Sequence, residues 1–195
     1  MTAAQVMTIL RYRLDDGLSG AFSDEELLSE VNNAKDLIEM LARVAISSES
    51  ATISSSSPTR VLTTVFNPVS VVISSSGVAL EKTNVAKLCT TNPTALYSTG
   101  TPKYWYMING TTLQLAPIPS TVTSVQIYGH VISGRITNTS AQLTTIPLCL
   151  QSTALVDLAE ANLRLSRSAV RGNADVAAFL MKRANELIGD YKQWS

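Results

Sequence analysis

All seven prolines of this 195-residue chain lie between Pro58 and Pro147, and the segments on either side contain none. Proline removes a backbone hydrogen bond and clashes with the preceding turn, so it is excluded from helix interiors. The proline-free ends carry helical patterns of apolar residues, whereas the middle is rich in Ser, Thr and Val. The distribution predicts an α+β protein with an N-terminal helical hairpin over 1–45, a β-rich insert over 46–145, and a C-terminal helical hairpin over 146–195.

Two helices are predicted in the N-terminal part, one from residue 2 or 3 to about residue 14 and one that begins after Ser23. Ser23 and Glu26 have the spacing of a capping box, and Phe22 and Leu27 stand where a hydrophobic staple would place them. Apolar residues then recur at three- and four-residue spacing, which indicates an amphipathic helix. Helix capping also accounts for the acidic run at 24–26, which could otherwise be taken for paired catalytic carboxylates.

Short β-patterned runs with turn residues between them fill the middle of the chain. They predict strands at 61–66, 69–73, 85–89, 104–108, 113–116 and 125–132. Asn109-Gly110 separates two of these runs and predicts a hairpin with a type I′ turn, because both residues tolerate positive φ. The Ser/Thr-rich tract at 47–59 is either a flexible connector or an edge strand. The whole pattern is typical of an antiparallel β-sandwich or a small barrel.

The C-terminal part predicts a helical hairpin. Pro147 suits the first turn of a helix that continues to about residue 168, a turn follows at 171–173, and a final helix ends near Trp194. Alanines on both helices favour close packing. The apolar stripes of all four helices need partners, so the two hairpins are expected to form one four-helix bundle.

No catalytic, cofactor-binding or metal-binding residue is predicted, and the chain is not expected to be an enzyme. One histidine, His130, cannot build a metal site with two distant cysteines, and it is interpreted as a solvent-facing strand residue. Cys89 and Cys149 lie in apolar runs and are expected to be buried thiols in a reducing compartment. The charges of the fifteen acidic and fifteen basic residues cancel, so the overall electrostatic field of the chain does not favour binding to nucleic acid or to a membrane.

Two groups of aromatic residues are candidate contact sites. Tyr104, Trp105 and Tyr106 form a run that could stack on a sugar or a base, although alternation along a strand would put Trp105 in the core. The second group is Tyr191, Lys192, Gln193 and Trp194, at the end of the last helix. Its aromatics either close the bundle or bind a partner, since Tyr and Trp are enriched at binding hot spots.

Three strings of residues give the chain a family resemblance. The first comprises 9–16, 22–28 and 31–34 in the N-terminal helices; the second is Gly-x-Pro at 100–102 with Leu-x-Leu-x-Pro-x-Pro at 113–119; the third is Ile146-Pro147 with the helical hairpin that follows. In this combination and order the chain resembles the head-to-tail adaptor (connector) proteins of tailed bacteriophages, particularly those of short-tailed phages. It departs from many of them at 65–68, where Val-Phe-Asn-Pro only approximates a Tyr-x-Leu-Pro string.

The resemblance implies a virion protein made in the host cytoplasm, which forms a ring, typically of twelve copies, beneath the portal at the capsid vertex. Such a ring extends the channel for double-stranded DNA, which passes without sequence-specific binding, and offers a platform for the tail or nozzle protein. It also implies that the group 191–194 contacts the portal. Tyr104, Trp105 and Tyr106 are candidates for contact with the tail or with a neighbouring subunit. Two alternatives stay open: a tail-completion or tail-tube ring protein, and a glycan-binding or adhesive β domain that uses residues 104–106.

Overall fold

The structure of the chain is a computed structural model that describes residues 1–14, 21–166 and 173–194. It is a mixed α+β protein, as predicted. The chain forms two compact units, one of residues 1–45 with 132–195 and one of residues 46–131. We call them the helical unit and the β unit, and describe each by itself.

The helical unit consists of α1 (Ala3–Arg13), α2 (Asp24–Ala42), α4 (Leu148–Gln151), α5 (Ala154–Ser166) and α6 (Asn173–Trp194). The predicted capping box of α2 is confirmed, because the Glu26 amide donates to Ser23 Oγ at 3.2 Å and the Ser23 amide donates to Glu26 Oε2 at 2.7 Å. A second capping box, between Thr2 and Gln5, begins α1. These local contacts explain why both helices begin where they do.

The first C-terminal helix is interrupted, whereas the sequence predicts one continuous helix. It is divided at Ser152 and Thr153 into the single turn α4 and the longer α5. The side chain of Thr153 donates to the carbonyl of Cys149 at 2.7 Å, and such local hydroxyl bonds compete with the regular helical ladder. The predicted end of this helix near residue 168, and the first two residues of the turn at 171–173, lie outside the described residues.

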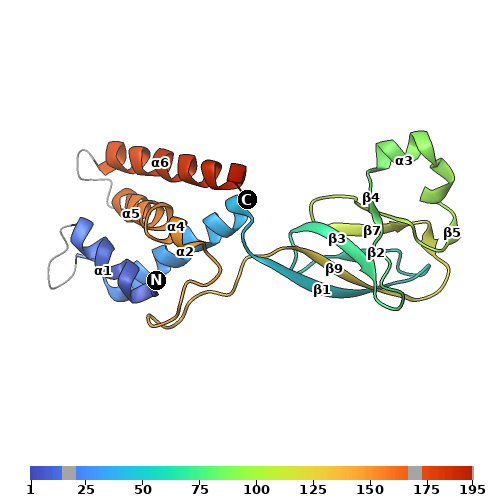
Figure 1. The fold of residues 1–195 in the computed structure, drawn as a ribbon, viewed down its shortest axis with the longest axis horizontal. Coiled ribbons are helices and arrows are strands. Elements are labelled where there is room, and N and C mark those ends of the chain that lie inside the picture. The colour runs from blue at the N-terminus through green and yellow to red at the C-terminus, as the bar shows by residue number, and fades with distance from the viewer. Residues whose placement is uncertain (15–20, 167–172, 195) are drawn as a thin grey trace. The chain divides into compact units, whose positions relative to one another are not determined.

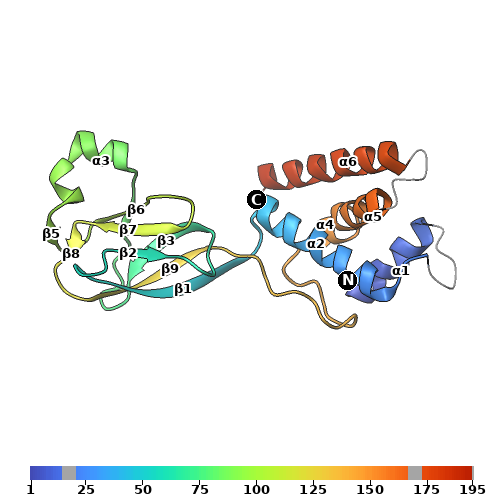
Figure 2. The same cartoon turned by 180° about the vertical axis from the view of Figure 1, so that it is seen from behind.

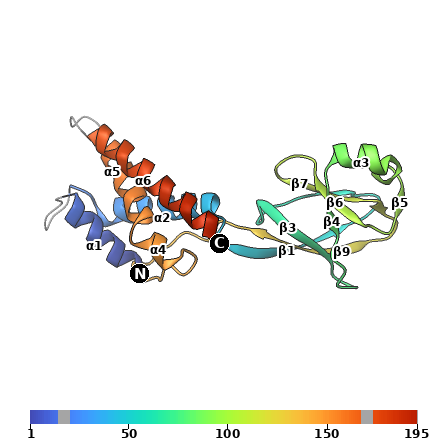
Figure 3. The same ribbon diagram turned by 45° about the horizontal axis from the view of Figure 1, so that its top comes forward.

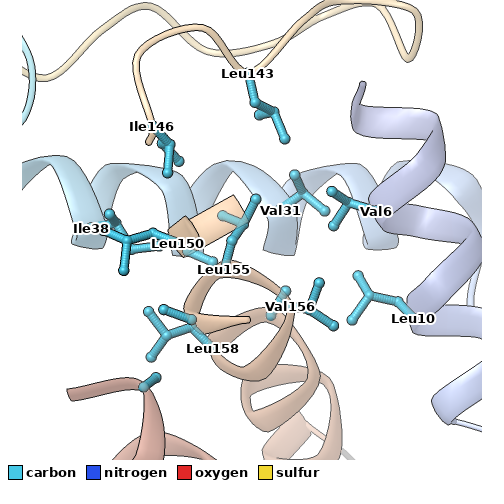
Figure 4. Close-up of a cluster of buried hydrophobic side chains, with 14 of the residues drawn as sticks. Val6, Leu10, Val31, Ile38, Leu143, Ile146, Leu150, Leu155, Val156 and Leu158 are labelled. Carbon is cyan, nitrogen blue, oxygen red and sulfur yellow. The ribbon is translucent and has the colours of Figure 1, made fainter. Parts of the chain in front are cut away.

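The core of the helical unit is formed by aliphatic side chains that converge from every one of its helices (Figure 4). Val6 and Leu10 come from α1, Val31 and Ile38 from α2, and Leu155 from α5. Each of these side chains is fully buried, and a fully buried aliphatic side chain contributes about 1.5–3 kcal/mol of transfer free energy. Apolar side chains of residues 1–45 therefore pack against apolar side chains of residues 146–195, and each set provides the partners that the apolar stripes of the other set need.

The segment 132–145 belongs to the helical unit, although the sequence placed it in the β-rich insert. It runs back along the helices without regular structure of its own: the Ala3 amide donates to the carbonyl of Ala141 at 3.1 Å, and Leu143 is buried in the core. The side chain of Asn32 bonds both the amide and the carbonyl of Ile136, at 2.7 and 3.0 Å. The predicted boundary at 145 is thus wrong, because polar side chains of α2 hold this extended segment.

The β unit contains the strands β1 (Ile46–Ile53), β2 (Thr59–Val61), β3 (Asn67–Ile73), β4 (Glu81–Lys82), β5 (Thr99–Gly100), β6 (Tyr104–Met107), β7 (Thr112–Ala116), β8 (Ile118–Pro119) and β9 (Thr123–His130). They form a three-stranded sheet in the order β1-β9-β3, a four-stranded sheet in the order β2-β7-β6-β4, and the pair β5-β8 (Figures 1 and 2). The longer pairings are antiparallel, whereas the short β4–β6 and β5–β8 pairings are parallel. Of the two interpretations of 47–59, the edge strand is confirmed for β1.

Three local predictions in the β unit are wrong. Residues 85–89 form the helix α3 (Val85–Thr91) rather than a strand, because the side chain of Asn84 accepts from the Lys87 amide at 2.7 Å and caps it. Together with the 3-10 turn Pro93–Leu96, α3 covers the β6–β7 hairpin (Figure 3).

The second wrong prediction is the strand at 61–66, of which only Val61 is in a strand. The third is the turn type: the hairpin exists, but neither Asn109 nor Gly110 has positive φ. Asn109 Oδ1 instead accepts from the amides of Thr111 and Thr112 at 3.0 and 2.7 Å, which makes an Asx turn.

The two cysteines also differ from expectation. Cys89 and Cys149 are free and exposed, not buried, because each lies on the outer side of a short helix whose neighbouring leucine, Leu88 or Leu150, enters the core. His130, expected to face solvent, is half-buried, and its ring lies 6.4 Å from that of Phe66.

Candidate interaction surfaces

The aromatic run on β6 contributes mainly to the core. Trp105 is 0% exposed and Tyr106 is 4% exposed, whereas Tyr104 is half-buried. Tyr106 packs with Leu88, and Lys82 Nζ lies 5.1 Å from the centre of the Trp105 ring. The expectation that Trp105 and Tyr106 meet a partner is therefore corrected, since neither side chain reaches the surface. Of the three aromatic residues, Tyr104 therefore remains the candidate for contact with a partner.

The end of α6 presents polar side chains. Lys192 and Gln193 are exposed, while Tyr191 is half-buried and packs against the helical core. The side chain of Trp194 lies outside the described residues. Tyr191 thus closes the bundle, and the exposed part of this candidate surface begins at Lys192.

A buried carboxylate fixes α6 against α1 and α5. Asp157 of α5 is completely buried; its Oδ1 accepts from Arg13 Nη1 at 2.8 Å and its Oδ2 accepts from Arg183 Nε at 2.6 Å. A further bond joins Arg183 Nη2 to Asp157 Oδ1. The hydrogen bond to Asp157 raises the pKa of Arg183. One side chain of α5 therefore holds a guanidinium from α1 and a guanidinium from α6.

A second carboxylate extends this network along α5. Glu160 accepts from Arg164 Nε at 2.8 Å and from Arg13 Nη1 at 3.5 Å, and Arg164 Nη2 donates to the carbonyl of Arg13 at 3.2 Å. Charge-assisted bonds of this kind are stronger than neutral ones. The end of α1 is consequently held on α5 by both its side chain and its main chain.

Glu39 holds the returning segment on α2. Its carboxylate accepts from the Ser133 amide at 2.7 Å, from Ser133 Oγ at 2.6 Å, and from the hydroxyl of Thr145, and Lys35 Nζ lies 3.2 Å away. Burial would raise the pKa of Glu39, but these hydrogen bonds, with the positive charge of Lys35, outweigh it and lower the pKa. Glu39 is therefore an ionised, buried clamp, that is, a carboxylate whose hydrogen bonds hold Ser133 and Thr145 on α2.

Glu49 plays a similar part in the β unit. Its carboxylate accepts from the amides of Thr63, Thr64 and Val65, at 3.1, 2.9 and 3.4 Å from Oε2. Burial would raise the pKa of Glu49, but the three amide bonds prevail and lower it. Because these amides bond to a side chain, they do not join a strand ladder, which explains why 62–66 is irregular.

Acidification is expected to destabilise both units. The pKa values of Glu39 and Glu49 lie below the ordinary 4.5, so between the two values the unfolded chain binds more protons than the folded one. The stabilisation is therefore present above pH 4.5 and is lost as the pH falls through the folded-state pKa values. Urea denaturation at a series of pH values should show that the urea concentration at the unfolding midpoint decreases once the pH is lowered below 4.5.

The Glu39→Gln variant provides the comparison for this prediction. It should be less stable than the unaltered chain at neutral pH and should show a smaller decrease on acidification, since one of the two titrating groups is gone. An acid dependence identical to that of the unaltered chain would contradict the assignment of Glu39 as an ionised clamp.

Several side chains outside these networks are exposed and apolar. The most exposed aromatics among them are Tyr12 of α1, Tyr97 of the β unit, and Phe179 of α6. Tyr12 and Phe179 were not among the predicted contact residues, and each is an aromatic residue that falls outside the apolar stripe of its helix. The β unit also has a hollow of about 350 Å³, lined by hydroxyl and apolar residues without a titratable group: Ile73, Ser75, Ser76, 100–102 and 120–124.

The described residues do not form a metal centre. In residues 1–14, 21–166 and 173–194, no three His, Cys, Asp or Glu side chains are grouped to hold a metal ion. None of the described helices is long and apolar enough to cross a membrane. The buried carboxylates bind arginines, hydroxyls and amides of the same chain, so they stabilise the fold.

Comparison with known proteins identifies the family. The model of the SU10 adaptor protein family matches residues 1–194. No curated protein matches the chain. A match of this extent covers both units and every candidate surface described above. The chain therefore belongs to the SU10 adaptor protein family of bacteriophage head-to-tail adaptors, and it is a structural protein of the virion rather than an enzyme.

Proposed function

We propose that this chain forms a closed ring of twelve copies beneath the portal of a short-tailed phage, where it extends the DNA channel and carries the tail or nozzle protein. The observation that carries the proposal is the match of residues 1–194 to the SU10 adaptor protein family. In this proposal the subunits are made in the host cytoplasm, are monomeric or weakly associated there, and form the ring on the portal.

The charge of the chain is compatible with DNA passage. Its net charge is zero, with 15 basic and 15 acidic residues. A strongly basic channel would bind the phosphate backbone and release counterions, so DNA would adhere to it. In this proposal the double-stranded DNA moves through the ring without being bound in a sequence-specific way.

The two units have different parts in the proposal. The helical unit acts as a four-helix bundle of α1, α2, α5 and α6, held by the Asp157 network, and the β unit acts as a small sandwich or barrel. Tyr104 is the contact candidate of the β unit, for the tail or for a neighbouring subunit, since it is the member of its group that is only half-buried.

The end of α6 is proposed as the portal contact. Tyr191 anchors the helix in the core, and Lys192 and Gln193 are exposed beyond it, followed by Trp194. A short exposed segment on a rigid helix loses little conformational entropy when it binds, and large aromatics at such positions bury much surface.

Deleting residues 192–195 is expected to abolish binding to the portal while leaving the fold intact. The deletion keeps Tyr191, so the core contact remains and the thermal melt measured by circular dichroism should change little. Cosedimentation with purified portal rings measures binding. The matched control is Lys103→Glu, a charge change at an exposed residue of the β unit, which should leave cosedimentation unchanged.

If the shortened chain cosediments with portal as well as the unaltered chain does, the docking role of this segment is wrong. Cosedimentation with isolated tails or tail tubes, but not with portal, would favour a tail-completion or tail-tube role instead.

A further inference from the structure

The exposed side chain of Arg43 has no partner within the described parts of the chain. It forms no hydrogen bond or ion pair with residues 1–14, 21–166 or 173–194. Every other lysine and arginine described in the helical unit, except Lys192, donates to or pairs with a group of the same chain. Arg43 and Lys192 are therefore the cations of this unit that are available to another molecule.

The backbone of Arg43 has a conformation that is unfavourable for an arginine. Arg43 ends α2 with φ 55° and ψ 38°, in the left-handed region. The Cβ of an L-residue is crowded there, so glycine is the usual residue at such a helix end. The capping bond, from the Arg43 amide to the carbonyl of Glu39 at 3.0 Å, needs only the main chain. The helix dipole favours a cation at this end, but it would favour lysine equally.

The two available cations lie at the same end of the helical unit. Arg43 ends α2, and Lys192 lies in the last turn of α6. The two helices pack against each other, and the end of α6 lies beside the end of α2 in all three views (Figures 1, 2 and 3). The next residue after Arg43, Val44, packs on the same core as Tyr191. Arg43 therefore extends the surface that we propose as the portal contact.

The nearby carboxylates do not neutralise this end. Asp36 and Glu39 of α2 are both bound to Lys35, at 2.7 and 3.2 Å. Asp190 of α6 is exposed, but it precedes Lys192 by two residues and so points to nearly the opposite side of the helix. Neither Arg43 nor Lys192 forms an ion pair with any of these three carboxylates.

The composition around Arg43 favours a protein as the partner. Met40, which is 45% exposed, lies three residues before Arg43 on the same side of α2. Methionine and arginine are enriched in protein–protein interfaces, whereas a nucleic-acid surface needs a dense cluster of lysines and arginines. Only two available cations are present here, and Asp190 would repel phosphate.

We infer that the portal surface facing this end of the helical unit is acidic, and that a portal carboxylate binds the guanidinium of Arg43. We call this end of the helical unit the docking end (Met40, Arg43, Lys192 and Gln193). A guanidinium can form two parallel hydrogen bonds with one carboxylate, which fixes the orientation of the subunit as well as adding affinity. The inference rests on the proposed function and gives the chemistry of the portal site.

Arg43→Gly should weaken portal binding and leave the fold at least as stable as before. Loss of one charge-assisted contact should raise the dissociation constant for portal rings about tenfold, measured by cosedimentation over a series of subunit concentrations. The melting temperature by circular dichroism should stay the same or rise, because glycine relieves the left-handed backbone. A side chain that only supports the fold would instead lower the melting temperature.

Further variants separate charge from geometry. Arg43→Lys keeps the charge and loses the paired hydrogen bonds, so its affinity should lie between those of the unaltered chain and Arg43→Gly. Arg43→Glu places a like charge against the portal carboxylate and should bind more weakly than Arg43→Gly. Lys103→Glu makes the same change of charge sign at an exposed residue of the β unit and should bind like the unaltered chain.

Salt provides an independent measurement. Binding of the unaltered chain to portal should weaken as sodium chloride is raised from 50 to 200 mM, and Arg43→Gly should show a smaller dependence, since one charged contact is gone.

The outcomes distinguish the inference from the proposed function. If the unaltered chain binds portal and Arg43→Gly and Arg43→Glu bind it equally well, the inference alone is overturned. Normal portal binding by these variants, combined with weaker retention of double-stranded DNA on a filter, would show that Arg43 contacts phosphate instead. If the unaltered chain does not bind portal at all, the proposed function is overturned, and the inference with it.

Discussion

Replacing Asp157 by alanine is expected to destabilise the helical unit by about 3 kcal/mol. The substitution leaves the guanidiniums of Arg13 and Arg183 without the buried carboxylate that both bind. The value lies at the low end for a broken buried ion pair because both arginines are partly exposed and can be hydrated after the loss. Urea denaturation followed by circular dichroism at the helical signal gives the measurement.

Glu186→Gln is the matched control for this prediction. It removes an acidic side chain from an exposed pair with Lys182, and such pairs contribute about 1 kcal/mol or less. A loss in Asp157→Ala no larger than the loss in this control would show that the Asp157 network does not hold α1, α5 and α6 together.

Replacing Gly129 by alanine should destabilise the β unit by about 3 kcal/mol, because the added Cβ has no space. It would lie 2.5 Å from Val65 Cγ1, 2.6 Å from the carbonyl oxygen of Asn67 and 2.8 Å from Pro68 Cα. Two of these three atoms belong to the backbone of β3, beside the register shift between Pro68 and Ser70, so the sheet itself must move. Thermal unfolding followed by tryptophan fluorescence, to which the buried Trp105 of the β unit contributes, would report the change.

Gly110→Ala tests whether the effect belongs to this position. A Cβ at residue 110 meets nothing within 4 Å, and Gly110 does not have positive φ, so its stability should change little. Equal melting temperatures for the two variants would mean that β3 does not approach Gly129 as closely as described.

The helical ends were predictable because their signals are local. The Ser23–Glu26 capping box and the apolar residues at three- and four-residue spacing depend only on neighbours within one or two turns. The same holds for the β6–β7 hairpin, where Asn109-Gly110 marks the turn even though its bonding is that of an Asx turn.

Two of the wrong predictions arose where a distant side chain decides the local structure. Glu49 binds the amides of Thr63 and Thr64 across the β unit, so a β-patterned run does not form a strand. Glu39 binds Ser133, 94 residues away along the chain, which places the segment 132–145 on the helices. Carboxylates of this kind have no sequence signature, since an acidic residue in a helix or strand is normally solvated.

The candidate surfaces were only partly predictable for the same reason. The composition of the runs at 104–106 and 191–194 drew attention to them, but the burial of Tyr106 depends on α3, which had been expected as a strand.

Electron microscopy of the unaltered chain mixed with portal rings tests the central claim most directly. The chain alone should be monomeric or weakly associated, at its subunit mass of 20.9 kDa, and addition of portal should produce a closed, twelvefold ring on one face of the portal with an open centre. A stable oligomer that is not a ring and that ignores portal would contradict the account.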